Sequence, residues 1–154
     1  MRDNLTPVRY DMVKLRLLKS IFFVNPSFTD PPEGQVASLA LSIKNAGSFA
    51  EAENEARFVM SFQALNSPQA PFALEVEFGA VFALSAPVHP RDQDYYLNVL
   101  FPQVVFPFLR EYVAETTRRG GFPPLLLNVS LSPEPKGSAG DPPDSLPVVA
   151  KWTH

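Results

Sequence analysis

Cysteine is absent from the 154-residue sequence, which excludes a disulfide framework and thiolate chemistry. Histidine is scarce: His89 stands among prolines and His154 is the last residue, so neither indicates a metal ligand or a catalytic base. No apolar run approaches the roughly 20 residues of a membrane-spanning helix, and the polar start of the chain does not resemble a signal peptide. We therefore expect a cytoplasmic protein without membrane insertion, metal or cofactor.

Motifs of catalysis are also missing from the sequence. It contains neither the phosphate-binding loop G-x-x-x-x-G-K-[ST] nor the nucleophile motif G-x-S-x-G. Glu75 and Glu77 project from one face of a predicted strand, as paired catalytic carboxylates do, but an acidic sheet surface is the simpler interpretation. The net charge of −3 gives no basic footprint for nucleic acid. The sequence predicts a protein that is not an enzyme and does not bind nucleic acid.

What the chain does contain is proline and phenylalanine, with 17 and 13 residues respectively. Clusters of proline divide it into apolar segments of strand length. Apolar and polar residues alternate in residues 12–24, 36–43, 57–65 and 72–84. Alternation of this kind indicates an antiparallel sheet that is covered on one face. The second half of residues 72–84 is apolar on both faces, so we expect another element to cover it.

A helix is predicted to provide that cover and to begin near Pro102, where a missing N–H costs nothing. Apolar residues continue at helical spacing on both sides of Pro107, which is expected to kink the helix. Arg118 and Arg119 suit the negative C-terminal end of a helix, and Gly120 is predicted to be its C′ residue.

The apolar positions of this helix span about 200° of its circumference. That arc is wider than one sheet can bury, so we expect one side to pack on the chain's own sheet and another on a second copy. A helix buried deep in a monomer core is the alternative. The residues predicted to form the oligomer interface are Val105, Phe106, Leu109, Tyr112 and Val113.

The stretch "LFPQVVFPFLREYVAETTRRGGFPPLLLNV" resembles the signature of the SecB family, the bacterial protein-export chaperones. The family patterns are C-P-x-x-L-F-P-Y-A-R-E, which leads into a long helix, and R-G-T-F-P-Q-L-x-L, which follows it. The matching residues are Pro102, Phe106, Pro107, Arg110, Glu111, Arg119, Gly120, Phe122, Pro123 and Leu125. Phe101 replaces the family's cysteine, and upstream Glu75, Val76, Gly79 and Phe82 resemble the family strand C-E-V-x-x-G-G-I-F.

The resemblance covers about residues 10–130 and implies an α+β fold, in which one long helix packs across a four-stranded antiparallel sheet. It implies dimers that pair sheet edge to sheet edge, and a tetramer in which helices join two dimers. The implied activity is that of an ATP-independent holdase, which binds unfolded or export-destined polypeptides and passes them to the SecA motor. Residues 8–131 are predicted to form this domain.

The C-terminal part departs from the family, which normally has a second amphipathic helix there. Residues 132–154 are rich in proline and glycine and have no helical period. We expect the second helix to be absent and these residues to form a disordered tail.

The resemblance also implies site residues. The row Leu39, Leu41 and Ile43 and the loop of residues 85–97, with Tyr95 and Tyr96, match regions that line the family's client groove. Ordinary packing in the core is the alternative for all five residues.

Glu75 matches an acidic residue that docks SecA in the family, and Glu77 is a second candidate, although an exposed strand glutamate is more often merely solvated. Ser20 and Val24 stand where the family has two further acidic residues. An alternative function is therefore a SecB-like chaperone dedicated to one partner, for example an antitoxin, or a structural interaction protein without transfer to SecA.

Overall fold

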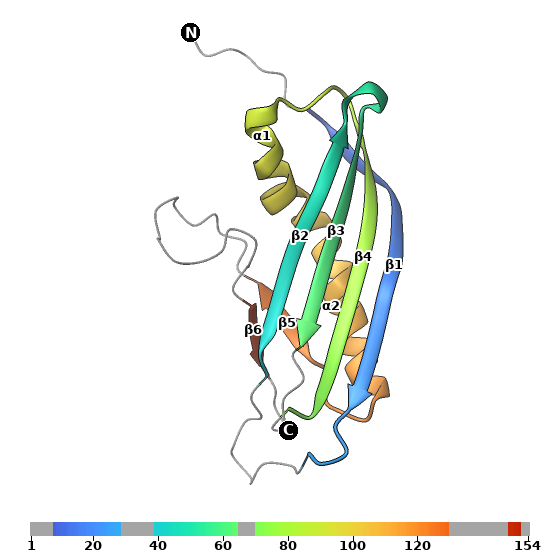
Figure 1. Ribbon diagram of the computed structural model, residues 1–154, viewed down its shortest axis with the longest axis vertical. Helices are drawn as coiled ribbons and strands as arrows, with labels where there is room; N and C mark the ends of the chain where they lie inside the picture. Colours follow the sequence, from blue (N-terminus) through green and yellow to red (C-terminus); the bar gives the residue numbers. More distant parts are fainter. Residues whose placement is uncertain (1–7, 29–38, 65–69, 130–147, 152–154) are drawn as a thin grey trace, which may run out of the picture.

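The computed structural model describes residues 8–28, 39–64, 70–129 and 148–151. Its four long strands are β1 (Tyr10–Val24), β2 (Leu41–Ala50), β3 (Glu55–Ala64) and β4 (Phe72–Leu84). They form one antiparallel sheet in the order β1-β4-β3-β2, and the helices lie across one of its faces (Figure 1). The prediction of a four-stranded antiparallel sheet crossed by one long helix is confirmed.

The helical segment starts earlier than predicted. It consists of α1 (Pro90–Tyr95), a π-helical turn η2 (Tyr96–Leu100) and α2 (Phe101–Arg119). α2 itself begins next to the predicted Pro102, but further helical turns precede it, so the predicted loop of residues 85–97 is wrong from residue 90 onward. Proline is favourable at the beginning of a helix, and here Pro90 takes that place, while the wide π turn accommodates the missing N–H of Pro102.

The end of α2 also differs from the prediction by one residue. Gly121, not Gly120, has the left-handed conformation, with a φ of 89°. Its N–H donates to the Arg118 carbonyl at 3.1 Å, and the Phe122 N–H donates to the Thr117 carbonyl at 3.1 Å. These two bonds form a Schellman cap. Gly120 leaves room for a neighbouring side chain, because a Cβ there would lie 2.5 Å from the ring of Phe22 and the ring would have to shift.

The core lies between the sheet and α2, on what we call the covered face of the sheet. Alternate residues of β3 and β4 are buried there, as the sequence pattern predicted, whereas their neighbours lie on the opposite, open face. Near the C-terminal end of β4, the rings of Phe82 and Phe101 stack with their centroids 4.0 Å apart, and both side chains are fully buried. Phe101, which stands at the family's cysteine position, therefore packs α2 against the sheet together with Val105, Leu109 and Val113.

The second strand is displaced relative to the prediction of residues 36–43. It begins at Leu41 and continues to Ala50, whereas residues 36–38 lie outside the described part of the chain. Apart from Phe49, residues 44–50 are small or polar and lack clear alternation, but every one of them pairs with β3, from Lys44 opposite Ser61 to Ala50 opposite Glu55. Pairing with a neighbouring strand thus outweighs the weak local preference of this segment.

Two short strands, β5 (Leu126–Val129) and β6 (Val148–Lys151), pair antiparallel in a separate sheet, and β6 lies beside β2 (Figure 1). Val148–Lys151 belong to the predicted tail, and the boundary at residue 131 stays a prediction. No helix follows α2 among the described residues, and residues 130–147 lie outside them. Within the described segments no helix is long and apolar enough to cross a bilayer.

Candidate functional site

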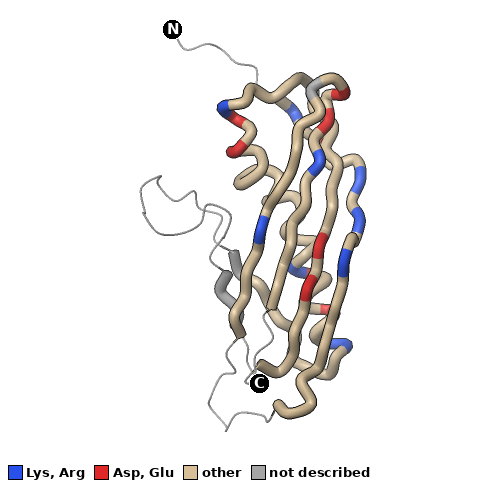
Figure 2. Tube along the Cα trace, in the orientation of Figure 1, with Lys and Arg blue, Asp and Glu red and all other residues tan. Residues whose placement is uncertain are grey.

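The open face of the sheet carries charges of both signs. Basic residues follow β1, with Lys14, Arg16 and Lys19 placed opposite Val81, Gly79 and Glu77 of β4. Figure 2 shows these basic positions beside the acidic positions of β4. The open face therefore differs from a uniformly acidic surface.

Glu75 is held in place by its neighbours on this face. Its carboxylate is 2.6 Å from Lys19 Nζ and accepts a hydrogen bond from Gln63 Nε2 at 3.2 Å. The hydrogen bond and the charge of Lys19 lower the pKa of Glu75, and the carboxylate raises the pKa of Lys19. Glu77 accepts a longer bond, 3.4 Å, from Ser61 Oγ. The predicted docking residues Glu75 and Glu77 thus share one face, and a docking role for them stays a prediction.

Ser20 and Val24 do not share that face. β1 contains register shifts between Met12 and Lys14 and between Leu17 and Lys19, and the second shift reverses the alternation of side chains. Ser20 pairs with Val76 on the covered face, where the Tyr112 hydroxyl donates to its Oγ at 2.7 Å. Ile21 and Phe23 occupy the open face instead.

The outer strand β1 exposes a set of apolar side chains that the sequence pattern did not single out. They occur on both faces and at the bulges, and Leu18 lies directly over Gly79. In the described sheet this 15-residue strand has β4 as its one neighbour, and an open edge with apolar surface is in general a template for association. The exposed residues are Val13, Leu17, Leu18, Ile21, Phe23 and Val24, with 40% to 66% of each exposed.

The row predicted for client binding is only partly accessible. Ile43 is fully buried against Phe62, its partner on β3, whereas Leu39 and Leu41 are half-buried at the margin of the core. Leu39 and Leu41 therefore remain available for an added chain, and Ile43 supports them from inside the core.

The two predicted tyrosines differ in the same way. Tyr95 is 53% exposed, at the end of α1. Tyr96 is buried: its hydroxyl donates to the Val8 carbonyl at 3.2 Å, and its ring packs edge-on against Tyr10 and Phe101. Burial raises the pKa of Tyr96. Tyr95 is the one of the pair that a ligand can reach.

Three of the helix residues predicted for the oligomer interface face the chain's own sheet. Val105, Leu109 and Val113 are fully buried within the protomer. Phe106 and Tyr112 are half-buried, and Phe108 is 42% exposed. A contact between copies through α2 would therefore involve the outer residues of the helix and not these three.

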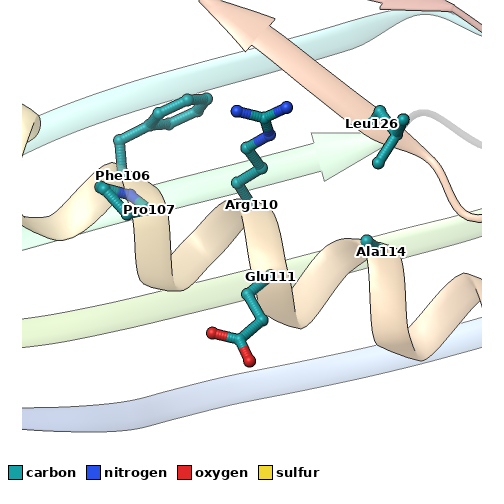
Figure 3. A pocket seen from close by; sticks show the side chains of 6 residues that line it. All are labelled: Phe106, Pro107, Arg110, Glu111, Ala114 and Leu126. Carbon is teal, nitrogen blue, oxygen red and sulfur yellow. The ribbon is translucent and has the colours of Figure 1, made fainter.

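The outer side of α2 contains a hollow of about 340 Å³ beside β5. In Figure 3, Phe106 and Arg110 point toward the side of Leu126, whereas Glu111 points away from it. Arg110 makes no ion pair with any residue of the described chain. The hollow was not predicted, although the spacing of its helix residues by three or four places them on one face. Its lining residues are Phe106, Pro107, Arg110, Glu111, Ala114 and Leu126.

Two polar groups in the interior have contrasting surroundings. The Thr117 hydroxyl donates to the Val113 carbonyl at 2.9 Å and accepts from the Leu125 N–H at 2.9 Å, which fixes the start of β5 to α2. On β2, the buried Oδ1 of Asn45 accepts no hydrogen bond from the described residues. It lies on the covered face, next to Gly47, over which the Leu97 side chain packs.

A family model described as preprotein translocase subunit SecB matches residues 24–129. The chain belongs to the SecB family. The protein-export protein SecB of Mesorhizobium japonicum is 30% identical over 122 residues, which are 75% of this chain and 71% of that protein. SecB of a Bradyrhizobium species is 33% identical over 119 residues, or 75% of this chain and 73% of that protein.

The SecB fold is also seen in a solved relative, the SecB-like chaperone Rv1957 of Mycobacterium tuberculosis in complex with a ChAD peptide from the HigA1 antitoxin. Its TM-score is 0.66 and its sequence identity 22%, over 79% of this chain and 91% of that chain. At this identity the likeness concerns the fold. The described residues contain no group of three His, Asp or Glu side chains arranged to hold a metal ion.

Proposed function

We propose that the protein is a holdase chaperone, which binds unfolded polypeptides on apolar surfaces without ATP and without catalysis. The observation that carries the proposal is the SecB-family match over residues 24–129, on a fold that leaves apolar side chains exposed. Tyr95, Phe108 and Leu126 are about half exposed on the helix side, and the hollow beside Leu126 offers further apolar area. Each contact of this kind contributes roughly 25 cal/mol per Å² buried, which suits reversible holding.

The exposed edge of β1 supports an oligomer of SecB type. Two copies that paired along β1 would satisfy its free backbone groups and bury apolar residues such as Leu18 and Phe23. The outer residues of α2 would then join two such dimers into a tetramer. Several weak sites on one tetramer hold a single long client together, because binding at one site raises the effective concentration of the client at the others.

A suppression assay with several unrelated clients tests the proposal. The full chain is mixed with chemically unfolded proteins of different composition, and aggregation on dilution is followed by light scattering. A general holdase suppresses aggregation of all of them at less than one tetramer per client. No suppression of any client would contradict the proposal.

A chaperone dedicated to one partner is the second candidate, and the open face favours it over transfer to SecA. Lys19 neutralises Glu75, and Ile21 and Phe23 occupy the neighbouring open-face positions of β1. Protection of a single co-expressed partner, with no effect on unrelated clients, would support this candidate. Binding of purified SecA to the open face, lost in Glu75→Lys, would contradict it.

A further inference from the structure

Strand β5 is anchored to the core and to α2 by contacts other than its pairing with β6. Leu125 and Leu127 are fully buried in the core, and the Leu125 N–H bonds to Thr117 Oγ1 of α2. These contacts hold the backbone of β5 extended along the helix layer. β5 is therefore a preformed edge that another extended strand can join.

The strand that occupies this edge, β6, is short. β6 pairs with β5 over four residues, from Leu126 opposite Lys151 to Val129 opposite Val148. The 18 residues of 130–147 connect the two strands. A two-stranded ribbon is marginally stable in water, so β6 depends on its tether and on its place beside β2.

We propose that the β6-facing edge of β5 is an acceptor for one extended segment of an unfolded polypeptide, and that Val148–Lys151 is the resident strand which that segment replaces. The inference rests on the proposed holdase function and names where a client binds. Pairing through backbone N–H and C=O groups suits clients of varied sequence, because every residue except proline supplies both groups.

The surroundings of β5 indicate which segments bind best. Leu126 is 48% exposed and also lines the hollow with Phe106 and Arg110 (Figure 3). An apolar client side chain beside Leu126 reaches the ring of Phe106. An acidic client side chain reaches Arg110, which has no ion-pair partner among the described residues. The edge therefore favours extended apolar segments that carry an acidic residue.

A reversible disulfide cross-link tests the proposal. Because the sequence contains no cysteine, only the introduced cysteines can pair. Leu126→Cys and Lys151→Cys are combined in the full chain, because these residues are direct Cα partners and antiparallel partners lie within disulfide range. The client is reduced, carboxymethylated lactalbumin, whose blocked thiols cannot exchange, and binding is measured by fluorescence anisotropy. The oxidised variant should bind the client at least about tenfold more weakly than the same variant after reduction.

A matched disulfide between two other strands is the control. Ala46→Cys with Val59→Cys joins direct partners of β2 and β3 on the open face, and its oxidation should leave client affinity unchanged. A chain that ends at residue 147 should bind the client about tenfold more tightly than the full chain, because the tethered competitor is gone.

Two results would overturn the proposal: equal client affinity of the oxidised and reduced Leu126/Lys151 variant, or failure of that disulfide to form under oxidant. If the wild-type chain itself binds no client, the holdase proposal fails instead. The experiment therefore distinguishes failure of the β5 proposal from failure of the holdase proposal.

Discussion

Strands β4 and β1 are hydrogen-bonded neighbours of 13 and 15 residues, yet they place their apolar side chains in opposite ways. β4 buries every second residue, from Phe72 to Leu84, in the layer beneath α2. β1 leaves Val13 61% exposed and Phe23 66% exposed.

The difference follows from position in the sheet. β4 is paired on both sides and its covered face meets α2, so its side chains stabilise the fold of one protomer. β1 is an edge strand of the described sheet with two register shifts, and six of its apolar side chains are 40% to 66% exposed. We therefore expect stability and association to depend on different strands.

Truncation on β4 should have the largest effect. Phe82→Ala removes a fully buried ring that stacks on Phe101 at 4.0 Å. We expect the free energy of unfolding to fall by about 3–5 kcal/mol, as measured by urea denaturation. A loss below about 1 kcal/mol would show that β4 and α2 do not form the main core.

Thr117→Val should have the next largest effect. The variant keeps the shape of the side chain but leaves the buried Leu125 N–H without its acceptor. We expect a loss of about 1–3 kcal/mol and faster amide exchange in β5. Thr116→Val is the control, because within the described residues the Thr116 side chain makes no hydrogen bond to β5. An equal loss there would contradict a specific role for Thr117.

Asn45→Leu should raise stability, because it removes a buried oxygen that accepts no hydrogen bond from the described residues. The expected gain is about 1 kcal/mol, visible as a higher urea midpoint. A lower midpoint would mean that the amide has a partner, such as a buried water molecule. Ser42→Ala on the open face of the same strand should change the midpoint little and serves as the control.

Phe23→Ala on β1 is the counterpart of Phe82→Ala. Because Phe23 is mostly exposed, we expect a change within about 0.5 kcal/mol per protomer, together with weaker association. Urea transitions at two protein concentrations separate the two effects, since only association makes stability depend on concentration. A loss of unfolding free energy as large as that of Phe82→Ala would contradict the proposed difference between β1 and β4.

The smallest effect is expected from Glu115 at the exposed end of α2. Hydrogen bonds from Arg118 and then Arg119 lower its pKa from 4.5 to about 2. Because the pKa of Glu115 is lower in the folded chain than in the unfolded chain, its charge stabilises the fold at pH values above about 4.5. This contribution is lost as pH falls from about 4.5 to 2. The Tm difference between wild type and Glu115→Gln should therefore shrink to zero over that interval. A difference that stays constant would contradict the pairing.

The strands were predictable where burial alternates strongly. Residues 72–84 were predicted with the boundaries that β4 has, because six large apolar residues fall on one face. The start of the helix was not predictable, since both Pro90 and Pro102 suit a first turn, and only the structure shows that the π turn η2 joins the two segments.

The candidate site was predicted in part. The shared face of Glu75 and Glu77 follows from a spacing of two in a strand. The placement of Ser20 on the covered face does not, because it depends on the bulge at Leu18. Gly79 was the available signal, since a glycine inside a strand often marks a close approach, and here Leu18 fills the space above it.

The mass of the purified full chain in solution tests most directly whether β1 is reserved for a partner. Light scattering after size exclusion should give four times the 17.0 kDa chain mass, and the mass should fall in Phe23→Ala. A mass of 17.0 kDa at all concentrations would contradict an association role for β1.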